Sequence, residues 1–308
     1  MKKNSLSIIS PVKDEEENLF DFYNSLIYVL NKISFFYEII FVNDGSTDGS
    51  LKKLKTLRSK DKRVKIIDFS RNFGREAAVT CGIDYASLDA FIVIDSDLQD
   101  SPKYIFNLVE SWQNGADIVF TKRKSRKDSF GKRITAFLFY RFLNLLTPTK
   151  MSLDTGDFCL FDKKVANELR KLKEKNRYLR GLLRWLGFKQ VIILVDREKR
   201  KKGRSSYSVR KMIDLAFSAI ISFSYWPLRL VGFLGVFILI GGIFLVFTPF
   251  GQSFDAKILN LIIFFLFGLL FLVLGIIGRY LATIHDEVLD RPLYIINELI
   301  GFDDRQKR

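Results

Sequence analysis

Two carboxylates follow a short apolar run near residue 95. Asp95 and Asp97 come directly after residues 91–94, Phe-Ile-Val-Ile, which predict a buried strand. Such a strand would deliver both carboxylates to the rim of a sheet on one short turn. Hard cations such as Mg2+ and Mn2+ take oxygen ligands and bind carboxylates together with substrate phosphates. The pattern therefore predicts a divalent-metal site, although a D-x-D sequence alone is also common as a helix cap.

A second polar turn follows the apolar run at residues 37–42. Residues 43–50 read N-D-G-S-T-D-G-S, and Asp, Gly and Ser are typical turn residues. Asp44 is suited to accept a hydrogen bond from a nucleotide base or ribose. The glycines lack the G-x-G-x-x-G order of dinucleotide-binding folds, so the turn alone predicts a strand-to-helix connection and leaves its ligand open.

The elements that must position these turns alternate between strand and helix patterns. This alternation predicts an α/β domain with a mainly parallel sheet. The expected strands are residues 6–10, 37–42, 64–69, 91–94 and 117–120. Ligands of such sheets bind outside the carboxyl ends of the strands. Both polar turns lie at such ends, as do residues 11–18 and 70–75.

The composition divides the 308 residues into a charged region and an apolar region, so the hydrophobic fraction of 48% is an average of the two. Two apolar runs, about 230–248 and 258–278, each approach the ~20 residues that cross a bilayer. The loop between them is short, and basic residues flank the base of the pair. The positive-inside rule then predicts a membrane hairpin with both termini in the cytoplasm. A soluble protein with two buried helices would need a larger core than this chain can form.

A formal net charge of +15 indicates an anionic partner. Because apolar spans occur in the same chain, anionic lipids and a lipid phosphate are favoured over nucleic acid. Two amphipathic stretches, about 122–148 and 207–228, predict helices in the membrane interface. For the first stretch, a core-facing helix with a solvated basic side also fits. Two isolated cysteines and a single histidine support neither a disulfide nor a zinc site.

Four ordered motifs carry a resemblance to a known family. They are S-P-V-K-D-E-E-E-N at 10–18, N-D-G-S-T-D-G-S at 43–50, R-N-F-G-R-E at 71–76 and D-S-D-L-Q-D at 95–100. The chain resembles the inverting glycosyltransferases of family 2, which have the GT-A fold. With T-G-D-F at 155–158, G-R-S-S-Y at 203–207 and the two spans, it resembles polyprenyl-phosphate glucosyltransferases and, more distantly, dolichyl-phosphate mannose synthases. Lys13 and Asp14 depart from the usual Tyr and Asn, which argues against a stacking contact with the base.

The resemblance implies roles for individual residues. Nucleotide-sugar binding falls to Pro11, Glu15, Asp44, Ser46, Asn72, Gly74 and Asp95. The implied metal ligands are Asp95, Asp97 and Gln99, and the implied catalytic residues are Asp157 and Asp97. Asp157 stands where such families carry their proposed base. A phosphate acceptor with a second pKa near ~6 is largely dianionic at neutral pH, so Asp157 is expected to orient it or to take its residual proton.

Donor and acceptor are both anionic, so cations must bring them together. We expect the acceptor phosphate to be bound by basic and hydroxyl side chains of the two segments beside the amphipathic stretches. These residues are Arg123, Arg126, Arg133, Arg200, Lys202, Arg204, Ser205 and Tyr207.

The expected function is metal-dependent, inverting transfer of glucose from UDP-glucose to a polyprenyl phosphate such as undecaprenyl phosphate, at the cytoplasmic face of a bacterial inner membrane. Mg2+ or Mn2+ is the expected cofactor. The expected organisation is a GT-A catalytic domain at 1–206, an interfacial helix at 207–228, a transmembrane hairpin at 229–280 and a cytoplasmic tail at 281–308. The resemblance also suggests a tetramer, and the product is expected to pass to a flippase. Packing on a neighbouring subunit is a hypothesis for the apolar residues of the tail, which are Leu289, Leu293, Ile295, Ile296 and Leu299.

Three alternatives remain open at this stage. The same chemistry with GDP-mannose or UDP-N-acetylglucosamine differs only in the donor. A processive polysaccharide synthase shares the D-x-D chemistry but normally carries a Q-x-x-R-W motif, and residues 180–185 have no Gln ahead of Arg184-Trp185. A non-catalytic membrane scaffold would be expected to have lost the acidic motifs, which are intact.

Overall fold

The computed structural model describes residues 4–124, 155–175, 177–196, 231–233, 235–238, 240 and 256–303. The chain divides into two compact units. The α/β unit consists of Met1–Tyr140, Met151–Ser208 and Pro292–Arg308, and the helical unit consists of Arg141–Lys150 and Val209–Arg291.

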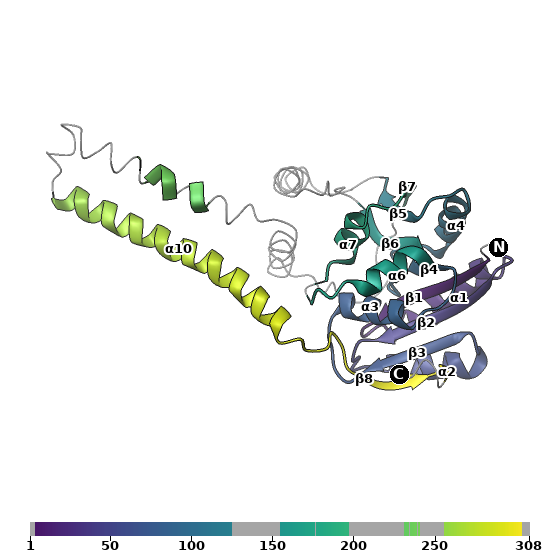
Figure 1. Cartoon of the computed structure of the whole chain (residues 1–308). Coiled ribbons are helices and arrows are strands. Elements are labelled where there is room, and N and C mark those ends of the chain that lie inside the picture. The colour runs from purple at the N-terminus through teal and green to yellow at the C-terminus, as the bar shows by residue number, and fades with distance from the viewer. Residues whose placement is uncertain are drawn as a thin grey trace. The chain divides into compact units, whose positions relative to one another are not determined.

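The α/β unit is built on one mixed sheet (Figure 1). Its strands are β1 (Ser5–Val12), β2 (Phe36–Asn43), β3 (Val64–Phe69), β4 (Ala90–Val93), β5 (Ile118–Arg123), β6 (Thr155–Asp162), β7 (Gln190–Val195) and β8 (Ile296–Ile300). The spatial order is β7-β5-β6-β4-β1-β2-β3-β8. Every pairing among these strands is parallel except those of β6 and β8. The carboxyl ends of the other six strands therefore share one edge of the sheet.

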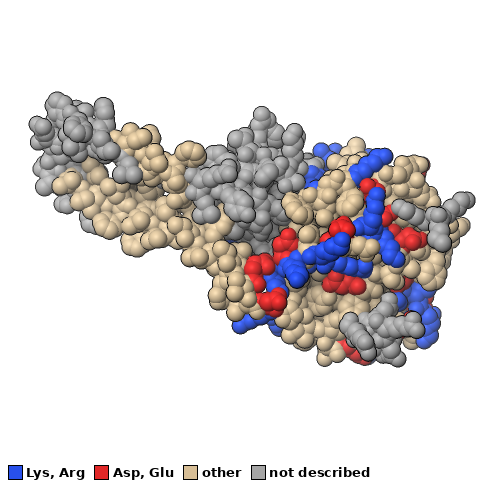
Figure 2. Space-filling model, viewed as in Figure 1, with Lys and Arg blue, Asp and Glu red and all other residues tan. Residues whose placement is uncertain are grey.

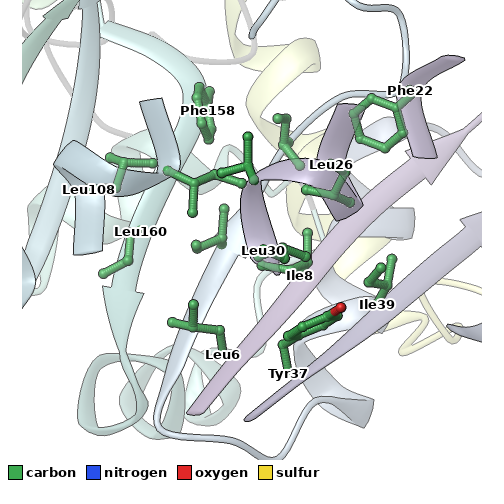
Figure 3. Packing of buried hydrophobic residues seen from close by; sticks show 14 of the residues in the cluster. Leu6, Ile8, Phe22, Leu26, Leu30, Tyr37, Ile39, Leu108, Phe158 and Leu160 are labelled. Atoms are coloured by element: carbon green, nitrogen blue, oxygen red, sulfur yellow. The ribbon is translucent and has the colours of Figure 1, made fainter. Parts of the chain in front are cut away.

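Helices cover both faces of the sheet. They are α1 (Leu19–Leu30), α2 (Ser50–Lys60), α3 (Arg75–Tyr85), the 3-10 turn η1 (Pro102–Tyr104), α4 (Ile105–Gln113), α6 (Lys163–Lys171) and α7 (Leu179–Trp185). Ile8 and its neighbours on β1 and β2 pack with Phe22 and Leu26 of α1 and Leu108 of α4 (Figure 3). Fully burying one such side chain stabilises the fold by about 1.5–3 kcal/mol.

Helix α3 packs on the opposite face, because side chains alternate along a strand. Its Gly82 lies so close to β1 that an added Cβ would stand 2.3 Å from Cγ2 of Ile9. This close approach fixes α3, and with it the residues at its N-terminus, against the centre of the sheet.

The five strands expected from the sequence are confirmed, whereas β6, β7 and β8 were not among them. Strand β8 comes from the segment expected to be a cytoplasmic tail at 281–308. The structure adds two observations about this segment. The preceding helix continues to Val288, beyond the expected end near 278. Ile296 and Leu299, which the sequence suggested for packing on another subunit, pair with β3 of their own chain.

The helical unit contains α10 (Ala256–Val288), a helix of 33 residues. Within its segment Phe265–Val288, an 18-residue window has a mean hydropathy of 2.2, and none of that window is buried. Within the described ranges, α10 is the one helix long and apolar enough to cross a membrane. Figure 2 shows most of the charged side chains on the α/β unit, whereas the surface along most of α10 is uncharged.

The other predicted membrane segments lie largely outside the described residues. Of the expected first span, residues 231–233, 235–238 and 240 are described, and all of them are helical. The interfacial segment at 207–228 lies wholly outside the described residues. Of the stretch at 122–148, only residues 122–124 are described.

Candidate active site

The loops after β1 and β2 are tied together by hydrogen bonds. The backbone N–H of Asp14 donates to Oγ of Ser46 at 3.0 Å, and Thr47 N–H donates to Oδ1 of Asp14 at 2.7 Å. Lys13 reaches across the same gap, and its Nζ donates to the Gly45 carbonyl oxygen at 2.7 Å. The two residues that depart from the usual motif thus hold the first two loops in a fixed arrangement.

Two further residues predicted to bind the nucleotide sugar occupy the base of these loops. Glu15 is buried, its backbone N–H donates to Oγ of Ser50 at 3.0 Å, and its Oε2 accepts from Nδ2 of Asn18 at 2.6 Å. Pro11 accepts a hydrogen bond from Oγ of Ser96 at its carbonyl oxygen, at 3.1 Å. Ser96 therefore connects the first loop to the segment that carries Asp95 and Asp97.

Asp44 organises the loop after β3. Its carboxylate accepts hydrogen bonds from the backbone N–H groups of Phe73 at 2.6 Å and Gly74 at 3.0 Å. Gly45 lets the two loops touch, because an added Cβ would lie 2.5 Å from the carbonyl carbon of Arg71. Burial raises the pKa of Asp44, and the two backbone donors oppose that shift only in part. The structure thus brings Asp44, Asn72 and Gly74 together at the same edge of the sheet.

Asp95 and Asp97 lie on a tight turn after β4. Leu98 has a φ of 61°, a left-handed conformation that is uncommon for a branched side chain. The Gln99 backbone N–H donates to Oδ1 of Asp97 at 3.0 Å and closes the turn. Asp97 remains partly exposed. Backbone strain of this kind is concentrated at functional sites, which is in keeping with a ligand-binding turn.

Arg75, the first residue of α3, joins Asp95 to Asp157. Its Nε and Nη2 donate to Oδ1 of Asp95 at 3.0 and 2.8 Å, and its Nη1 lies 3.8 Å from Oδ1 of Asp157. The pairing of β4 with β6 explains the proximity of the two carboxylates. The ladder ends where Val93 lies opposite Cys159, so Asp95 and Asp157 each lie two residues beyond the last pair, at the same end of the two strands.

Asp157 is held between two guanidinium groups. Nε of Arg180, on α7, lies 2.7 Å from Oδ1 of Asp157, on the other side from Arg75. Burial acts to raise the pKa of Asp157, but Arg75 and Arg180 lower it below the usual value of an aspartate. Glu76 belongs to the same network, since its Oε1 accepts from Arg75 at 3.2 Å and its Oε2 from the Leu179 backbone at 2.9 Å.

The donor set at this edge fits a divalent cation that shares its coordination shell with a ligand. Within residues 4–124 and the other described ranges, no group of three or more His, Cys, Asp and Glu side chains is arranged to hold a metal by itself. Mg2+ commonly takes one or two carboxylates and fills its shell with water and substrate phosphates. Asp97 offers such a carboxylate on the partly exposed turn, while Asp95 is already bound by Arg75.

The predicted acceptor residues are only partly described. Arg123 is exposed at the carboxyl end of β5, on the same edge of the sheet as Asp95. The other seven lie outside the described residues: Arg126, Arg133, Arg200, Lys202, Arg204, Ser205 and Tyr207.

Residues 7–170 match the sequence profile of Glycosyl transferase family 2. The chain belongs to this family. This glycosyltransferase is similar to the glycosyltransferase YkcC of Bacillus subtilis, with 41% identity over 97% of this chain and 95% of the relative. It is also similar to the bactoprenol glucosyl transferase of Shigella phage SfII, with 36% identity over 95% of this chain and 97% of the relative.

The fold of the transferase is also found in solved structures. One is glucosyl-3-phosphoglycerate synthase from Mycobacterium tuberculosis, crystallised with Mn2+, UDP and phosphoglyceric acid. It superimposes with a TM-score of 0.50 and 17% identity, covering 71% of this chain and 76% of that one. At this identity the similarity supports the fold, and the predicted GT-A architecture is confirmed as an α/β fold with a mostly parallel sheet.

Sequence reasoning missed three charged residues of the transferase that contact the predicted site. Arg75 and Glu76 belong to the R-N-F-G-R-E motif but received no role, and Arg180 was considered only in a search for a polysaccharide-synthase motif. A charged pair at the start of a helix that follows a strand end is a usable signal for the first two. No pattern in the neighbouring sequence distinguishes Arg180, because its contact with Asp157 depends on how α7 packs.

Proposed function

We propose that this glycosyltransferase transfers glucose from UDP-glucose to a polyprenyl phosphate, with inversion at the anomeric carbon. The observation that carries the proposal is the geometry at the sheet edge, where Asp95 and Asp157 face each other through Arg75, beside Asp97. The choice of glucose and of a polyprenyl acceptor is supported by similarity to bactoprenol glucosyl transferases over nearly the whole chain.

The donor is assigned to the parallel half of the sheet. Asp44, with the loop that it holds, and the buried Glu15 would bind the nucleoside, and Ser46, Asn72 and Gly74 line the same loops. Asp97, with Asp95 and Gln99 as the further predicted ligands, would hold Mg2+ or Mn2+. The bound cation would neutralise the charge that develops on the departing diphosphate.

The acceptor is assigned to the side of Asp157. A phosphate oxygen would attack the anomeric carbon as the bond to UDP breaks, which converts an α-linked donor into a β-linked lipid sugar. The lowered pKa of Asp157 makes it a weak base, and a dianionic phosphate hardly needs one. Asp157 would therefore act by orienting Arg75 and Arg180, whose positive charges would attract the reacting anions.

A membrane hairpin is supported by the connectivity of the sheet. Strand β8 belongs to the same sheet as β1 to β7. If α10 crosses a bilayer, the chain must cross an even number of times between Val195 and Ile296 to bring β8 back to that sheet. The apolar run at 230–248 would supply the second crossing, which leaves both termini on the cytoplasmic side.

The remaining elements of the proposal concern the membrane side of the reaction. The proposal also includes the domain boundaries given above, acceptor binding by the basic segments at 122–148 and 197–211, a tetrameric assembly and transfer of the product to a flippase. The tetramer rests on the family resemblance, and the flippase step follows from a lipid product that is formed at the cytoplasmic face and used elsewhere.

The test is an assay of the purified full chain in lipid nanodiscs. Short-chain polyprenyl phosphate is incubated with radiolabelled UDP-glucose, GDP-mannose or UDP-N-acetylglucosamine, with Mg2+, with Mn2+ or with EDTA. We expect metal-dependent label in the lipid from UDP-glucose. Label transferred from another donor alone would contradict the choice of glucose, and full activity in EDTA would contradict the metal.

The metal ligand is tested by Asp97→Ala in the same assay. Loss of the carboxylate should reduce kcat by roughly a hundredfold or more, because it removes charge stabilisation of the leaving group. Glu110→Ala, on the exposed side of α4, is the matched control and should keep wild-type turnover. Wild-type turnover in Asp97→Ala would overturn the assignment.

A further inference from the structure

The last strand of the chain lies against the elements that carry the donor site. Strand β8 pairs antiparallel with β3, with Asp68 opposite Glu298. Beyond the strand, the backbone N–H of Ser70 donates to the carbonyl oxygen of Ile295 at 3.0 Å. Ser70 begins the loop that runs to Gly74 and Arg75. This segment lies outside residues 7–170, which match the family.

A partly buried polar chain connects β8 to the nucleotide loop. Nδ2 of Asn297 donates to Oδ2 of Asp68 at 2.9 Å, and Nδ2 of Asn43 donates to Oδ1 of Asp68 at 2.7 Å. Asp68 and Asn43 are almost fully buried. Asn43 directly precedes Asp44, whose carboxylate holds the backbone of Phe73 and Gly74. The Asp68 carboxylate thus links the C-terminal strand to Asn43, the residue that precedes Asp44.

An aromatic contact reaches the same loop from the other side. The ring of Tyr294 stacks on Phe69, with centroids 5.3 Å apart and an interplanar angle of 5°. Phe69 in turn meets Phe73 edge to face at 5.7 Å. The Tyr294 hydroxyl donates to Oδ2 of Asp84 on α3 at 2.8 Å. Tyr294 therefore contacts both the end of β3 and the helix that begins with Arg75.

A third contact holds the far end of α3. Phe302 is 7% exposed, and its ring meets Tyr85 edge to face at 5.4 Å. Tyr85 is the last residue of α3. The segment from Tyr294 to Phe302 thus contacts α3 at two points and β3 along its length.

We propose that this C-terminal segment is a positioning element of the donor site, and that Asn297 and Tyr294 are positioning residues for nucleotide binding. The inference rests on the proposed function, because it takes the loops around Asp44 and Gly74 as the nucleoside site. Asn297 acts through Asp68 and Asn43, and Tyr294 acts through Phe69 and Phe73. The chain reaches this segment only after α10, so the donor site is completed by the part of the polypeptide that follows the apolar helix.

Asn297→Ala tests the polar chain against a matched control on the same strand. Glu298 faces outward, where its carboxylate pairs with Lys55 at 2.6 Å, and Glu298→Ala leaves the polar chain intact. UDP and GDP are titrated calorimetrically into the full chain with Mn2+ present, and thermal unfolding is recorded for each variant. We expect Asn297→Ala to weaken UDP binding by about fivefold to tenfold, because the buried Asp68 carboxylate loses one of its two amide donors. Glu298→Ala should bind UDP like the wild type.

A purely structural role would lower the unfolding temperature of Asn297→Ala and leave the UDP affinity of the folded protein unchanged. Equal affinity in Asn297→Ala and Glu298→Ala would therefore overturn the inference. Wild-type protein that binds UDP but transfers no glucose to polyprenyl phosphate would count against the proposed function alone, because the binding comparison does not require transfer.

A pair of Tyr294 variants provides the test if Asn297→Ala does not fold. Tyr294→Phe keeps the ring that stacks on Phe69, whereas Tyr294→Ala removes it. We expect the KM for UDP-glucose to rise by roughly fivefold in Tyr294→Ala and to stay near the wild-type value in Tyr294→Phe, with little change in the KM for the lipid acceptor. Equal donor KM values in the two variants would contradict positioning by the ring.

Discussion

The two halves of the sheet, β1 to β4 and β5 to β7, contribute to the site in different ways. In the parallel half, β1, β2, β3 and β4 all end at one edge, and the residues that follow each strand bind one another through short hydrogen bonds. In the antiparallel half, Asp157 lies near the beginning of β6 and reaches the same edge because β6 runs in the opposite direction. The parallel half is thus held by its own loops, and Asp157 is held by arginines from α3 and α7.

The difference indicates that the two halves have different roles in the site. Donor-binding groups sit on loops that are organised before any ligand arrives, which lowers the entropy lost on binding. Asp157 instead sits in a network of charges whose positions depend on three separate elements. Arg75 contacts a carboxylate of each half.

Arg75→Met should have the largest effect, because it removes the side chain that contacts both Asp95 and Asp157. Removing one partner from a buried ion pair costs about 3–5 kcal/mol, and here Asp95 and Asp157 both lose Arg75. We expect kcat to fall by roughly a hundredfold or more and the unfolding temperature to fall as well. Turnover of radiolabelled UDP-glucose and calorimetry measure the two effects.

The controls for Arg75 separate charge from geometry. Arg75→Lys keeps the charge but loses the planar fork that binds Asp95 twice, so its activity should fall between that of Arg75→Met and the wild type. Arg63→Met removes a more exposed arginine paired with Asp61 and should leave turnover unchanged. An Arg75→Met enzyme with wild-type kcat would mean that the two halves work independently.

Asp44→Asn should have a smaller effect that is confined to the parallel half. An amide keeps one oxygen acceptor but presents an NH2 group to the loop, so one of the bonds to Phe73 and Gly74 is lost. We expect the KM for UDP-glucose to rise by about tenfold, with kcat nearly unchanged. Asp21→Asn, on the exposed side of α1, is the control. A large fall in kcat would place Asp44 in the chemistry rather than in donor binding.

The smallest expected effect is on the pH dependence of the rate. Burial opposes ionisation of Asp157, but Arg75 and Arg180 lower its pKa below the usual value, so it stays ionised from mildly acidic pH upward. The loss of rate as pH falls should therefore follow the acceptor phosphate, with a pKa near ~6. Wild type and Asp157→Asn should show the same acid limb in kcat against pH. An acid limb that disappears in Asp157→Asn would identify Asp157 as the titrating base.

The contrast between the halves also explains what the sequence could reveal. Alternation of strand and helix patterns predicted β1 to β5, and the rule that ligands bind at carboxyl ends of strands placed Asp44, Asp95 and Asp97 at one edge. Each of these inferences uses only neighbouring residues. The GT-A fold and the glycosyltransferase family were expected from the resemblance that the ordered motifs carry, and the comparisons confirm the family and an α/β fold with a mostly parallel sheet.

The strand and the residues that were not predicted from the sequence are defined by contacts between residues far apart along the chain. Strand β8 is reached only after α10, and its apolar residues suggested packing on another subunit because no local pattern names β3 as their partner. Arg180 meets Asp157 through the packing of α7. The roles of the individual site residues remain predictions, and the basic acceptor residues beyond Arg123 lie outside the described part of the chain.

The late position of β8 affects how the protein is made. The ribosome completes β3 long before it reaches residue 296, so a nascent α/β unit has an open strand edge while the apolar segments are being synthesised. Open edges favour pairing with other chains. Fast synthesis of the residues between β3 and β8 would shorten the period in which this edge is open, and pairing of β8 with β3 then covers it.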